Sequence, residues 1–222
     1  MTHAYDESYV RLARASLARA FDYAVNDEQL DLDVFCSLFV SSGVARRFQN
    51  GDARTIAGQS GVELARETLA GTPGYRPAPA RYATGRSPEY WTGWALAYYQ
   101  WFAGLSFRRI FSAVPASTII DLYHPYHEMD IAHFVERMGA LMRDAERQPR
   151  LAWYRQRMGL TQRELAERSG IPVRSIQQYE QRQKHINRAG FETVIALARA
   201  LNCTDPCDLL ELDPVPPVRA AQ

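Results

Sequence analysis

Cysteine and long apolar runs are scarce in this sequence of 222 residues. The cysteines, Cys36, Cys203 and Cys207, are odd in number and have the spacing of neither a disulfide framework nor a tetrahedral zinc site, so we expect free thiols. No apolar run approaches the roughly 18 residues that a membrane-spanning helix needs. The opening MTHAYDESYV lacks the basic and apolar segments of an export signal. We therefore expect a cytoplasmic protein without membrane contact.

Long alternations of apolar and polar residues, the pattern of a half-buried strand, are also missing. Apolar residues instead recur at three- and four-residue spacing, which is the period of an amphipathic helix. The clearest helical faces are Tyr9, Leu12, Ala13, Ser16, Leu17, Ala20 and Phe21, and then Phe35, Leu38, Phe39 and Ser42. The same period runs through residues 61–69, 89–102, 107–114, 116–122 and 128–145. The sequence therefore predicts an all-α protein.

Two proline-containing stretches divide the chain. The Gly/Pro/Arg-rich residues 71–88 predict a long loop. Proline lacks a backbone donor and disfavours helix in the residue before it, so we expect one helix to end near Gln148 and another to begin at Pro149. The predicted organisation is a helical N-terminal domain at 1–146, a second domain at 147–212 and a disordered, proline-rich tail at 213–222.

Basic charge is concentrated in one segment, although the net charge of the whole chain is only +1. Residues 147–190 contain 10 basic and 3 acidic side chains, a balance of +7. Residues 1–146 contain 14 basic and 17 acidic ones, a balance of −3. A basic block of this kind releases condensed counterions when it binds the phosphate backbone of a nucleic acid. A solvated helical surface would have the same composition, so charge alone does not decide between them.

The segment LTQRELAERSGIPVRSIQQYEQ has small and turn-forming residues where two crossing helices need them. Ala166 lets the helices approach, and Gly170 tolerates the left-handed backbone of a tight turn. Thr161 and Glu164 form a capping box at the start of the first helix, and Pro172 opens the second. The side chains predicted to point inward are Leu165, Ile171, Ile176 and Tyr179.

With these residues the segment resembles the lambda-repressor/Cro family, also called the XRE family, over residues 151–212. FETVIALARALNC and DPCDLLEL resemble the two helices that close the family's five-helix domain. The resemblance implies a helix-turn-helix domain that binds double-stranded DNA through the major groove. An ordinary helical hairpin without a DNA partner is the alternative. The five helices are expected at 149–158, 162–169, 172–181, 191–201 and 206–212.

The resemblance also implies roles for individual residues of the motif. Gln162, at the start of the first helix, would grip a phosphate together with the helix N-terminus. Base edges would be read from the second helix by Val173, Arg174, Gln177 and Gln178. Arg174 suits guanine O6 and N7, either glutamine suits adenine, and Val173 suits a thymine methyl group. Contacts to the DNA backbone would come from Ser175, Arg182, Gln183, Lys184, Asn187 and Arg188.

Two residues depart from the family's pattern. Ser169 occupies a position that is usually apolar, and Arg182 replaces the glycine that commonly ends the recognition helix. We therefore expect this helix either to continue or to end in a different cap.

The N-terminal segment RSPEYWTGWALAYYQWFAGLSF is dense in aromatic residues. At helical spacing such side chains are most often core residues. Alternatively, they line a ligand pocket or present a face to a partner protein. A second candidate, IAGQSGVELARE, places Gly58, Gly61 and Glu63 at a helix start, which suits either a small anion or peptide site or a tight turn.

Catalytic and metal-binding patterns are weak. His124 and His127 enclose a proline in YHPYHEMD, so their imidazoles cannot share one helical face as in a zinc-binding HExxH segment. Ser60 in GQSGV is one residue short of a nucleophile elbow and follows no predicted strand. Because no set of nucleophile, acid and base can be assembled, we expect no enzyme, no metal and no cofactor.

The sequence thus predicts a bacterial DNA-binding transcriptional regulator of repressor type. One motif per chain buries too little surface for tight operator binding, so we expect a homodimer on two half-sites. The N-terminal domain would dimerise, or sense a small ligand or a partner protein. The alternative is an antitoxin that binds a toxin through residues 1–146 and its own promoter through the helix-turn-helix.

Overall fold

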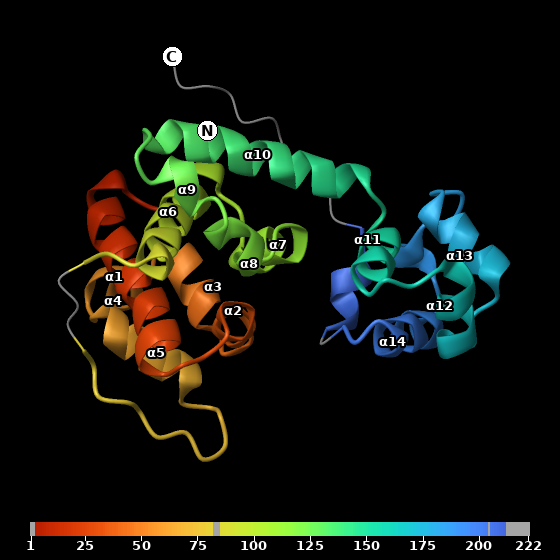
Figure 1. Ribbon diagram of the computed structural model, residues 1–222, viewed down its shortest axis with the longest axis horizontal. Helices are drawn as coiled ribbons and strands as arrows, with labels where there is room; N and C mark the ends of the chain where they lie inside the picture. Colours follow the sequence, from red (N-terminus) through yellow and green to blue (C-terminus); the bar gives the residue numbers. More distant parts are fainter. Residues whose placement is uncertain (1–2, 82–84, 204, 212–222) are drawn as a thin grey trace. The chain divides into compact units, whose positions relative to one another are not determined.

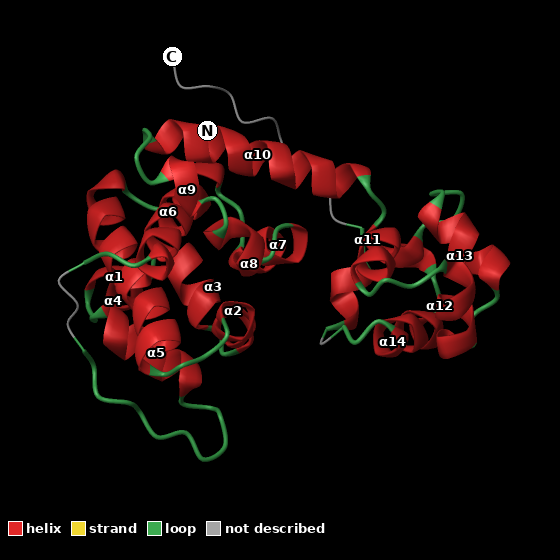
Figure 2. Ribbon diagram, viewed as in Figure 1, coloured by secondary structure: helices red, strands yellow, loops and turns green. Residues whose placement is uncertain are grey.

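Helices and their connecting loops make up the part of the chain that the computed structural model describes, residues 3–81, 85–203 and 205–211 (Figure 2). No strand occurs among these residues, so the prediction of an all-α protein is confirmed. None of the described helices combines the length and the apolar character of a membrane span. The tail predicted to be disordered, residues 213–222, lies outside the described residues.

The chain divides into two compact units, residues 1–139 and residues 140–222. This division falls within the long helix α10 (Ile131–Arg147). The sequence placed the domain border further along the same helix, after residue 146. That border and the functions of the two domains remain predictions.

In the N-terminal unit α1 packs against α5 and α6, and several shorter helices accompany them (Figure 1). Its elements are a 3-10 turn (Glu7–Tyr9), α1 (Val10–Asp22), a π-helical turn (Tyr23–Asp27), α2 (Leu32–Ser41), α3 (Val44–Gln49), α4 (Ala53–Ala57), α5 (Gly61–Leu69), α6 (Pro88–Ala103), α7 (Phe107–Ala113), α8 (Ala116–Ile120), α9 (Tyr123–Tyr126) and the first part of α10. The helix predicted at 61–69 has the bounds of α5. Every other periodic segment also contains a helix, with ends displaced by a few residues.

Helix α1 approaches α5 and α6 closely because glycines face it. A Cβ atom at Gly93 of α6 would lie 2.6 Å from the carbonyl oxygen of Leu17, which is too close for any side chain. A Cβ atom at Gly61 of α5 would likewise collide with the carbonyl oxygen of Ser16. Backbone approach therefore accounts for both glycines without a ligand.

The predicted helical faces are buried except at one end, the start of the first face and the end of the second. Leu17, Phe21 and Phe39 are fully buried. Leu12, near the start of α1, is 40% exposed, and Ser42, just beyond α2, is also exposed. The periodicity thus identified which side of each helix faces the core, and it included residues that lie beyond the edge of that core.

Aromatic rings form much of this core. Phe39 of α2 lies edge-on to Phe107 of α7 and to Phe48 of α3, with ring centroids 5.1 and 6.3 Å apart. Trp91 of α6 packs against Phe134 of α10 at 5.3 Å. The buried aromatic residues of α6 are Trp91, Tyr99 and Trp101. Of the two interpretations of the aromatic segment, core packing therefore describes these three side chains.

Two further aromatic residues of α6 are only partly buried and contact an arginine. The guanidinium carbon of Arg14 in α1 lies 3.3 Å from the ring centroid of Trp94 and 4.7 Å from that of Tyr98. Burial lowers the pKa of Arg14 to about 10. The rings thus stabilise a cation that has lost much of its hydration.

The long loop before α6 is fastened to the N-terminal unit by one carboxylate. Oε1 of Glu28 accepts hydrogen bonds from the hydroxyl groups of Tyr23 and Tyr75, at 2.7 and 2.6 Å, and from the backbone N–H of Ala78 at 3.0 Å. The described residues of the predicted loop, 71–81 and 85–87, have irregular structure as expected. Pro88, the last residue of the prediction, already belongs to α6.

Among its described residues, the C-terminal unit contains the last part of α10, four complete α-helices and two 3-10 turns (Figure 1). The complete elements are α11 (Arg150–Arg157), α12 (Gln162–Ser169), α13 (Val173–Glu180), a 3-10 turn (Ile186–Arg188), α14 (Phe191–Ala200) and a second 3-10 turn (Pro206–Leu209). The prediction for α12 is confirmed at both ends. The fifth predicted helix, 206–212, was wrong in type, because the described part is a 3-10 turn; residue 212 lies outside the described residues.

Aliphatic side chains form the core of this unit. Leu165 of α12 and Ile176 of α13 are fully buried, as predicted. Tyr179 and Ile171 are partly buried and pack against the same cluster. Each fully buried leucine or isoleucine contributes about 1.5–3 kcal/mol to folding. The inward side chains of the motif therefore fix how α12 and α13 cross.

Candidate nucleic-acid interface

The start of α12 has the predicted capping box. The carboxylate of Glu164 accepts hydrogen bonds from the backbone N–H of Thr161 at 2.7 Å and from its hydroxyl group at 2.8 Å. The Thr161 hydroxyl in turn accepts from the backbone N–H of Glu164 at 3.2 Å. The backbone N–H of Thr161 stabilises the ionised carboxylate and holds the pKa of Glu164 below its usual value.

The turn between α12 and α13 has a left-handed residue at the predicted position. Gly170 has φ 70°, and its N–H donates to the carbonyl oxygen of Ala166 at 2.9 Å. Ser169 donates its hydroxyl proton to the carbonyl oxygen of Leu165 at 2.7 Å. This bond satisfies the hydroxyl group, which explains why a usually apolar position accepts serine. Pro172 caps α13 from outside, rather than forming its first residue as predicted.

The outer face of α13 is accessible. Arg174 and Gln177 are exposed, and Val173, Ser175 and Gln178 are partly exposed. Ile176, on the opposite face, is fully buried. A helix held from one side in this way presents the other side to a partner.

A buried ion pair joins α13 to α11 and α12. Arg155 of α11 donates to both carboxylate oxygens of Glu180, the last residue of α13, at 2.7 and 2.9 Å. Gln162, the first residue of α12, donates its amide N–H to Glu180 Oε2 at 2.7 Å. The Arg155 and Glu180 side chains are only 12% and 6% exposed. Because the ion pair has two hydrogen bonds and little exposure, it restricts the movement of the three helices relative to one another.

Arg155 and Glu180 were missed in the sequence, although one signal could have identified the glutamate. Glu180 follows the inward-facing Ile176 by four residues, so it lies on the same helical face. A charge on a buried face needs a partner of opposite sign. Its partner is 25 positions away, and no local pattern identifies it.

Residues 151–208 match the family model for the helix-turn-helix. This segment is an XRE-family helix-turn-helix domain. The family binds DNA, so the C-terminal unit contains a DNA-binding domain. The match does not extend to the N-terminal unit. No curated protein and no solved structure matches the chain.

Helix α13 is followed, two residues after its end, by an arginine in the left-handed conformation. Arg182 has φ 55°, and its N–H donates to the carbonyl oxygen of Tyr179 at 3.1 Å. The helix therefore ends at Glu180 in the cap geometry that glycine usually provides, with the strain of a side chain at positive φ. The sequence left two possibilities for Arg182, a longer helix or a different cap. The helix does not continue, so the second one holds.

The loop after α13 is fastened to the end of the domain by Glu211. The side-chain amide of Asn187 donates to the carbonyl oxygen of Glu211 at 2.9 Å and accepts from its backbone N–H at 2.8 Å. The guanidinium group of Arg182 lies 3.3 Å from the Glu211 carboxylate. The backbone N–H of Arg150 donates to the same carboxylate at 3.1 Å. Asn187 and Arg182 thus have internal partners in addition to their predicted contacts with DNA.

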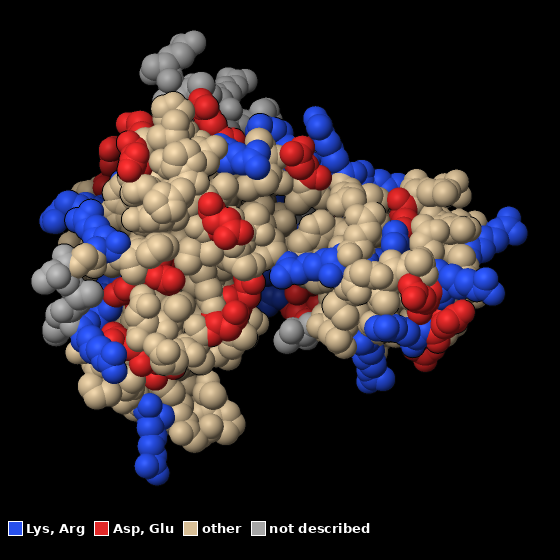
Figure 3. Space-filling model, in the orientation of Figure 1, with Lys and Arg blue, Asp and Glu red and all other residues tan. Residues whose placement is uncertain are grey.

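The remaining predicted backbone contacts are at the surface. Gln183, Lys184 and Arg188 are exposed, and the Gln183 amide donates to the side-chain oxygen of Gln181 at 2.9 Å. On the face drawn in Figure 3, Lys and Arg side chains stand out from the C-terminal unit at several points, with acidic side chains between some of them.

Histidine and cysteine residues of the described chain gather in no metal-ligand group. Among the described residues, no three of the His, Cys, Asp and Glu side chains are close enough to hold a metal ion together. Nδ1 of His127 lies 2.9 Å from the carbonyl oxygen of Tyr123. None of the three cysteines, which all lie in the described residues, belongs to a disulfide, and burial raises the pKa of Cys203 to about 12.

Proposed function

We propose that the chain is a sequence-specific transcriptional regulator of repressor type, in which α13 reads the major groove of DNA. The supporting observation is the exposed outer face of α13, held in place by the Arg155–Glu180 ion pair on its inner side. A reading helix must keep its side chains in register with the base edges, and a buried two-pronged ion pair at the end of that helix restricts its movement.

The residue types on α13 suit direct reading of bases. Arg174 can donate two hydrogen bonds to guanine O6 and N7, and Gln177 or Gln178 can pair with adenine N6 and N7. Val173 can contact a thymine methyl group. Ser175 lies at the partly exposed side of the same helix, where a phosphate contact is the more suitable role.

The proposed phosphate contacts lie at the start of α12 and beyond the C-terminal end of α13. Gln162 has a second amide N–H besides the one that Glu180 accepts, and it lies at the N-terminus of α12, where the helix dipole favours an anion. Lys184 and Arg188 supply exposed cations beyond the other end of α13. Arg182, Gln183 and Asn187 complete the proposed set of backbone contacts.

We further propose a homodimer, with a role for the N-terminal unit in dimerisation or in sensing a ligand or partner. A single domain of this size buries little DNA surface, and two copies on half-sites one helical turn apart supply the missing affinity. A cytoplasmic location accords with access to the chromosome.

Selection of the preferred DNA site, followed by affinity measurements at fixed salt, tests the proposal. Arg174→Ala should weaken binding to the selected site by about 1–3 kcal/mol, roughly five- to 150-fold in Kd, and relax the preference at one base pair. Gln162→Ala should weaken binding to all sequences alike. Arg199→Ala removes an exposed positive charge from α14 and serves as the control. Unchanged affinity of Arg174→Ala would disprove base reading by this residue.

An antitoxin would use the same DNA-binding domain and would differ in what the N-terminal unit binds. The antitoxin hypothesis predicts a stable complex between the N-terminal unit and a small toxin encoded by a neighbouring gene. Co-expression of the chain with its neighbour, followed by size-exclusion chromatography, separates the alternatives. Co-elution in fixed stoichiometry supports the antitoxin, and separate elution supports the repressor.

A further inference from the structure

Helix α14 of the C-terminal unit (Figure 1) has one buried face and one accessible face. Leu197 and Ala198, on the buried face, belong to the aliphatic core of the unit. The opposite face is a stripe of residues at i, i+3, i+4 and i+7, namely Glu192, Ile195, Ala196 and Arg199. The two charged residues of this stripe are exposed, and the two apolar residues between them are partly exposed. The outer stripe is therefore accessible to a partner.

The outer stripe is complementary to a second copy of itself. Glu192 and Arg199 lie equally far in sequence from the middle of α14, and Ile195 and Ala196 lie on either side of that middle. A two-fold axis through the middle, perpendicular to the helix, would place a second α14 antiparallel to the first. Glu192 of each copy would then face Arg199 of the other, and Ile195 and Ala196 would each meet their own counterparts. One contact would thus form two ion pairs around an apolar centre.

Two further observations favour this pairing. Neither Glu192 nor Arg199 has an ion-pair partner among the described residues. Phe191, which precedes Ile195 by one turn at the edge of the stripe, is 78% exposed, more than any other large hydrophobic side chain in the described chain. A second α14 would pair both charges and cover part of this ring.

We propose that α14 pairs with α14 of a second copy when two chains occupy neighbouring half-sites on DNA. This inference rests on the proposed function, because it names the surface through which the proposed homodimer forms. A helix of 10 residues is about 15 Å long. One face of such a helix buries far less than the roughly 800 Å² per partner of a stable interface. The contact therefore adds cooperativity on DNA and does not hold a dimer together in solution by itself.

Binding of the full-length chain to DNA with one and with two half-sites tests the contact. The two half-sites form an inverted repeat whose centres are one helical turn apart. Glu192→Arg and, independently, Arg199→Glu place like charges opposite each other on both sides of the two-fold axis. Each variant should reduce the cooperativity, measured as the gain in affinity from the second half-site, by about tenfold. Affinity for the single half-site is the reference that accounts for the changed net charge of each variant.

The double variant Glu192→Arg/Arg199→Glu separates the contact from an effect of the helix dipole. Within one chain, the dipole also favours Glu192 near the N-terminus of α14 and Arg199 near its C-terminus. The double variant is unfavourable to the dipole at both ends, so it should have the lowest Tm. It restores both ion pairs between copies, so the cooperativity of the wild type should return. Cooperativity that fell with Tm through all three variants would disprove the contact.

Controls distinguish failure of this contact from failure of the proposed function. Glu167→Arg reverses an exposed charge on α12, outside the stripe, and should leave the cooperativity unchanged. Circular dichroism verifies that each variant folds. Base reading by Arg174 is tested on the single half-site, which binds one copy, so Arg199→Ala remains a valid control there.

Unchanged cooperativity in both single charge-reversal variants would overturn the α14 contact and leave base reading intact. The same conclusion would follow if the wild type bound two half-sites without cooperativity. A lack of sequence preference on the half-site would contradict the proposed function instead. Duplexes with room for one copy or for two would then replace the half-sites in the comparison of the α14 variants.

Discussion

The two units of the chain are stabilised by different kinds of side chain. The N-terminal unit has a core rich in phenylalanine rings, such as those of Phe39, Phe48 and Phe107, which meet edge-on. The C-terminal unit has an aliphatic core, to which the buried pair of Arg155 and Glu180 is added. The N-terminal unit has an ion pair of comparable burial, between Arg19 and Asp27, so the contrast between the units lies in the side chains of their cores. The comparison implies that the two units are sensitive to different substitutions.

The largest effect is expected in the aromatic core. Phe39→Ala should destabilise the N-terminal unit by about 3–5 kcal/mol, because it removes a fully buried ring that contacts three others. Denaturant unfolding combined with hydrogen exchange of each unit measures the loss. Val34→Ala on the same helix, at a side chain that is 50% exposed, is the control and should cost far less. Equal losses in the two variants would disprove the aromatic core as the main source of stability.

The corresponding test in the C-terminal unit is Glu180→Ala. It leaves the buried Arg155 guanidinium without its carboxylate and should destabilise this unit by about 3 kcal/mol. Thermal unfolding followed by hydrogen exchange assigns the loss to the unit. Glu167→Ala is the matched control, because its ion pair with Arg163 is exposed and contributes about 0.5 kcal/mol or less. If Glu180→Ala unfolded no earlier than Glu167→Ala, the ion pair would have no structural importance.

The same glycine-to-alanine change should cost stability in the two units for different reasons. At Gly93 the new Cβ would meet the Leu17 carbonyl oxygen, so α1 and α6 must separate, at a cost of about 1–3 kcal/mol. At Gly170 no atom lies within 4 Å of the new Cβ, and positive φ alone costs about 1 kcal/mol. Equilibrium unfolding of both variants measures the difference. A larger loss at Gly170 than at Gly93 would reverse the comparison.

The smallest effect is common to both units. Glu63 in α5 and Glu164 in α12 close equivalent capping boxes, and the backbone N–H groups of Ser60 and Thr161 lower the pKa of these carboxyl groups. A pKa lowered by folding adds stability above the unfolded value of about 4.3, and this stability is lost as the pH falls through the folded pKa. The Tm advantage of the wild type over Glu63→Gln and over Glu164→Gln should therefore shrink between pH 7 and pH 3. An advantage that grew on acidification would contradict the sign.

Local signals in the sequence determined how well each element could be predicted. Both ends of α12 were predicted correctly, because the Thr161–Glu164 capping box marks its start and Gly170 marks its end. The predicted helices around α13 and α11 were one residue too long at each end, since Pro172 and Pro149 are N-caps and Gln181 and Met158 are C-caps. The last element was wrong in type. The side chain of Asp205 caps a turn there that does not extend into a full helix.

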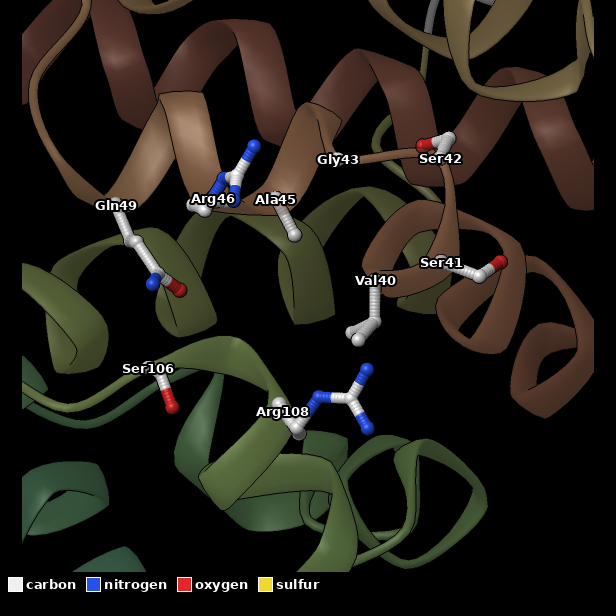
Figure 4. Close-up of a pocket in the computed structure, with 9 residues that line it drawn as sticks. All are labelled: Val40, Ser41, Ser42, Gly43, Ala45, Arg46, Gln49, Ser106 and Arg108. Atoms are coloured by element: carbon white, nitrogen blue, oxygen red, sulfur yellow. The ribbon is translucent and has the colours of Figure 1, made fainter. Parts of the chain in front are cut away.

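Features that depend on distant residues could not be predicted in the same way. The helical period indicated most helices of the N-terminal unit, but it says nothing about how they pack. A cavity of about 600 Å³ between α3 and the start of α7 could not be predicted, because residues near 46 and near 108 come together only in the fold (Figure 4). The same holds for Gln162, whose proposed phosphate contact was suggested by the family resemblance, whereas its bond to Glu180 required the fold.

The bond between Gln162 and Glu180 has a consequence for the choice of DNA. Glu180 ends the helix that would read bases, and Gln162 begins the helix that would hold a phosphate. The separation between the phosphate contact and the base contacts is therefore set within the protein. A duplex whose groove width or twist differs from this spacing would have to deform before both contacts form. Such a domain should discriminate among operators by their stiffness, including at base pairs that it does not touch.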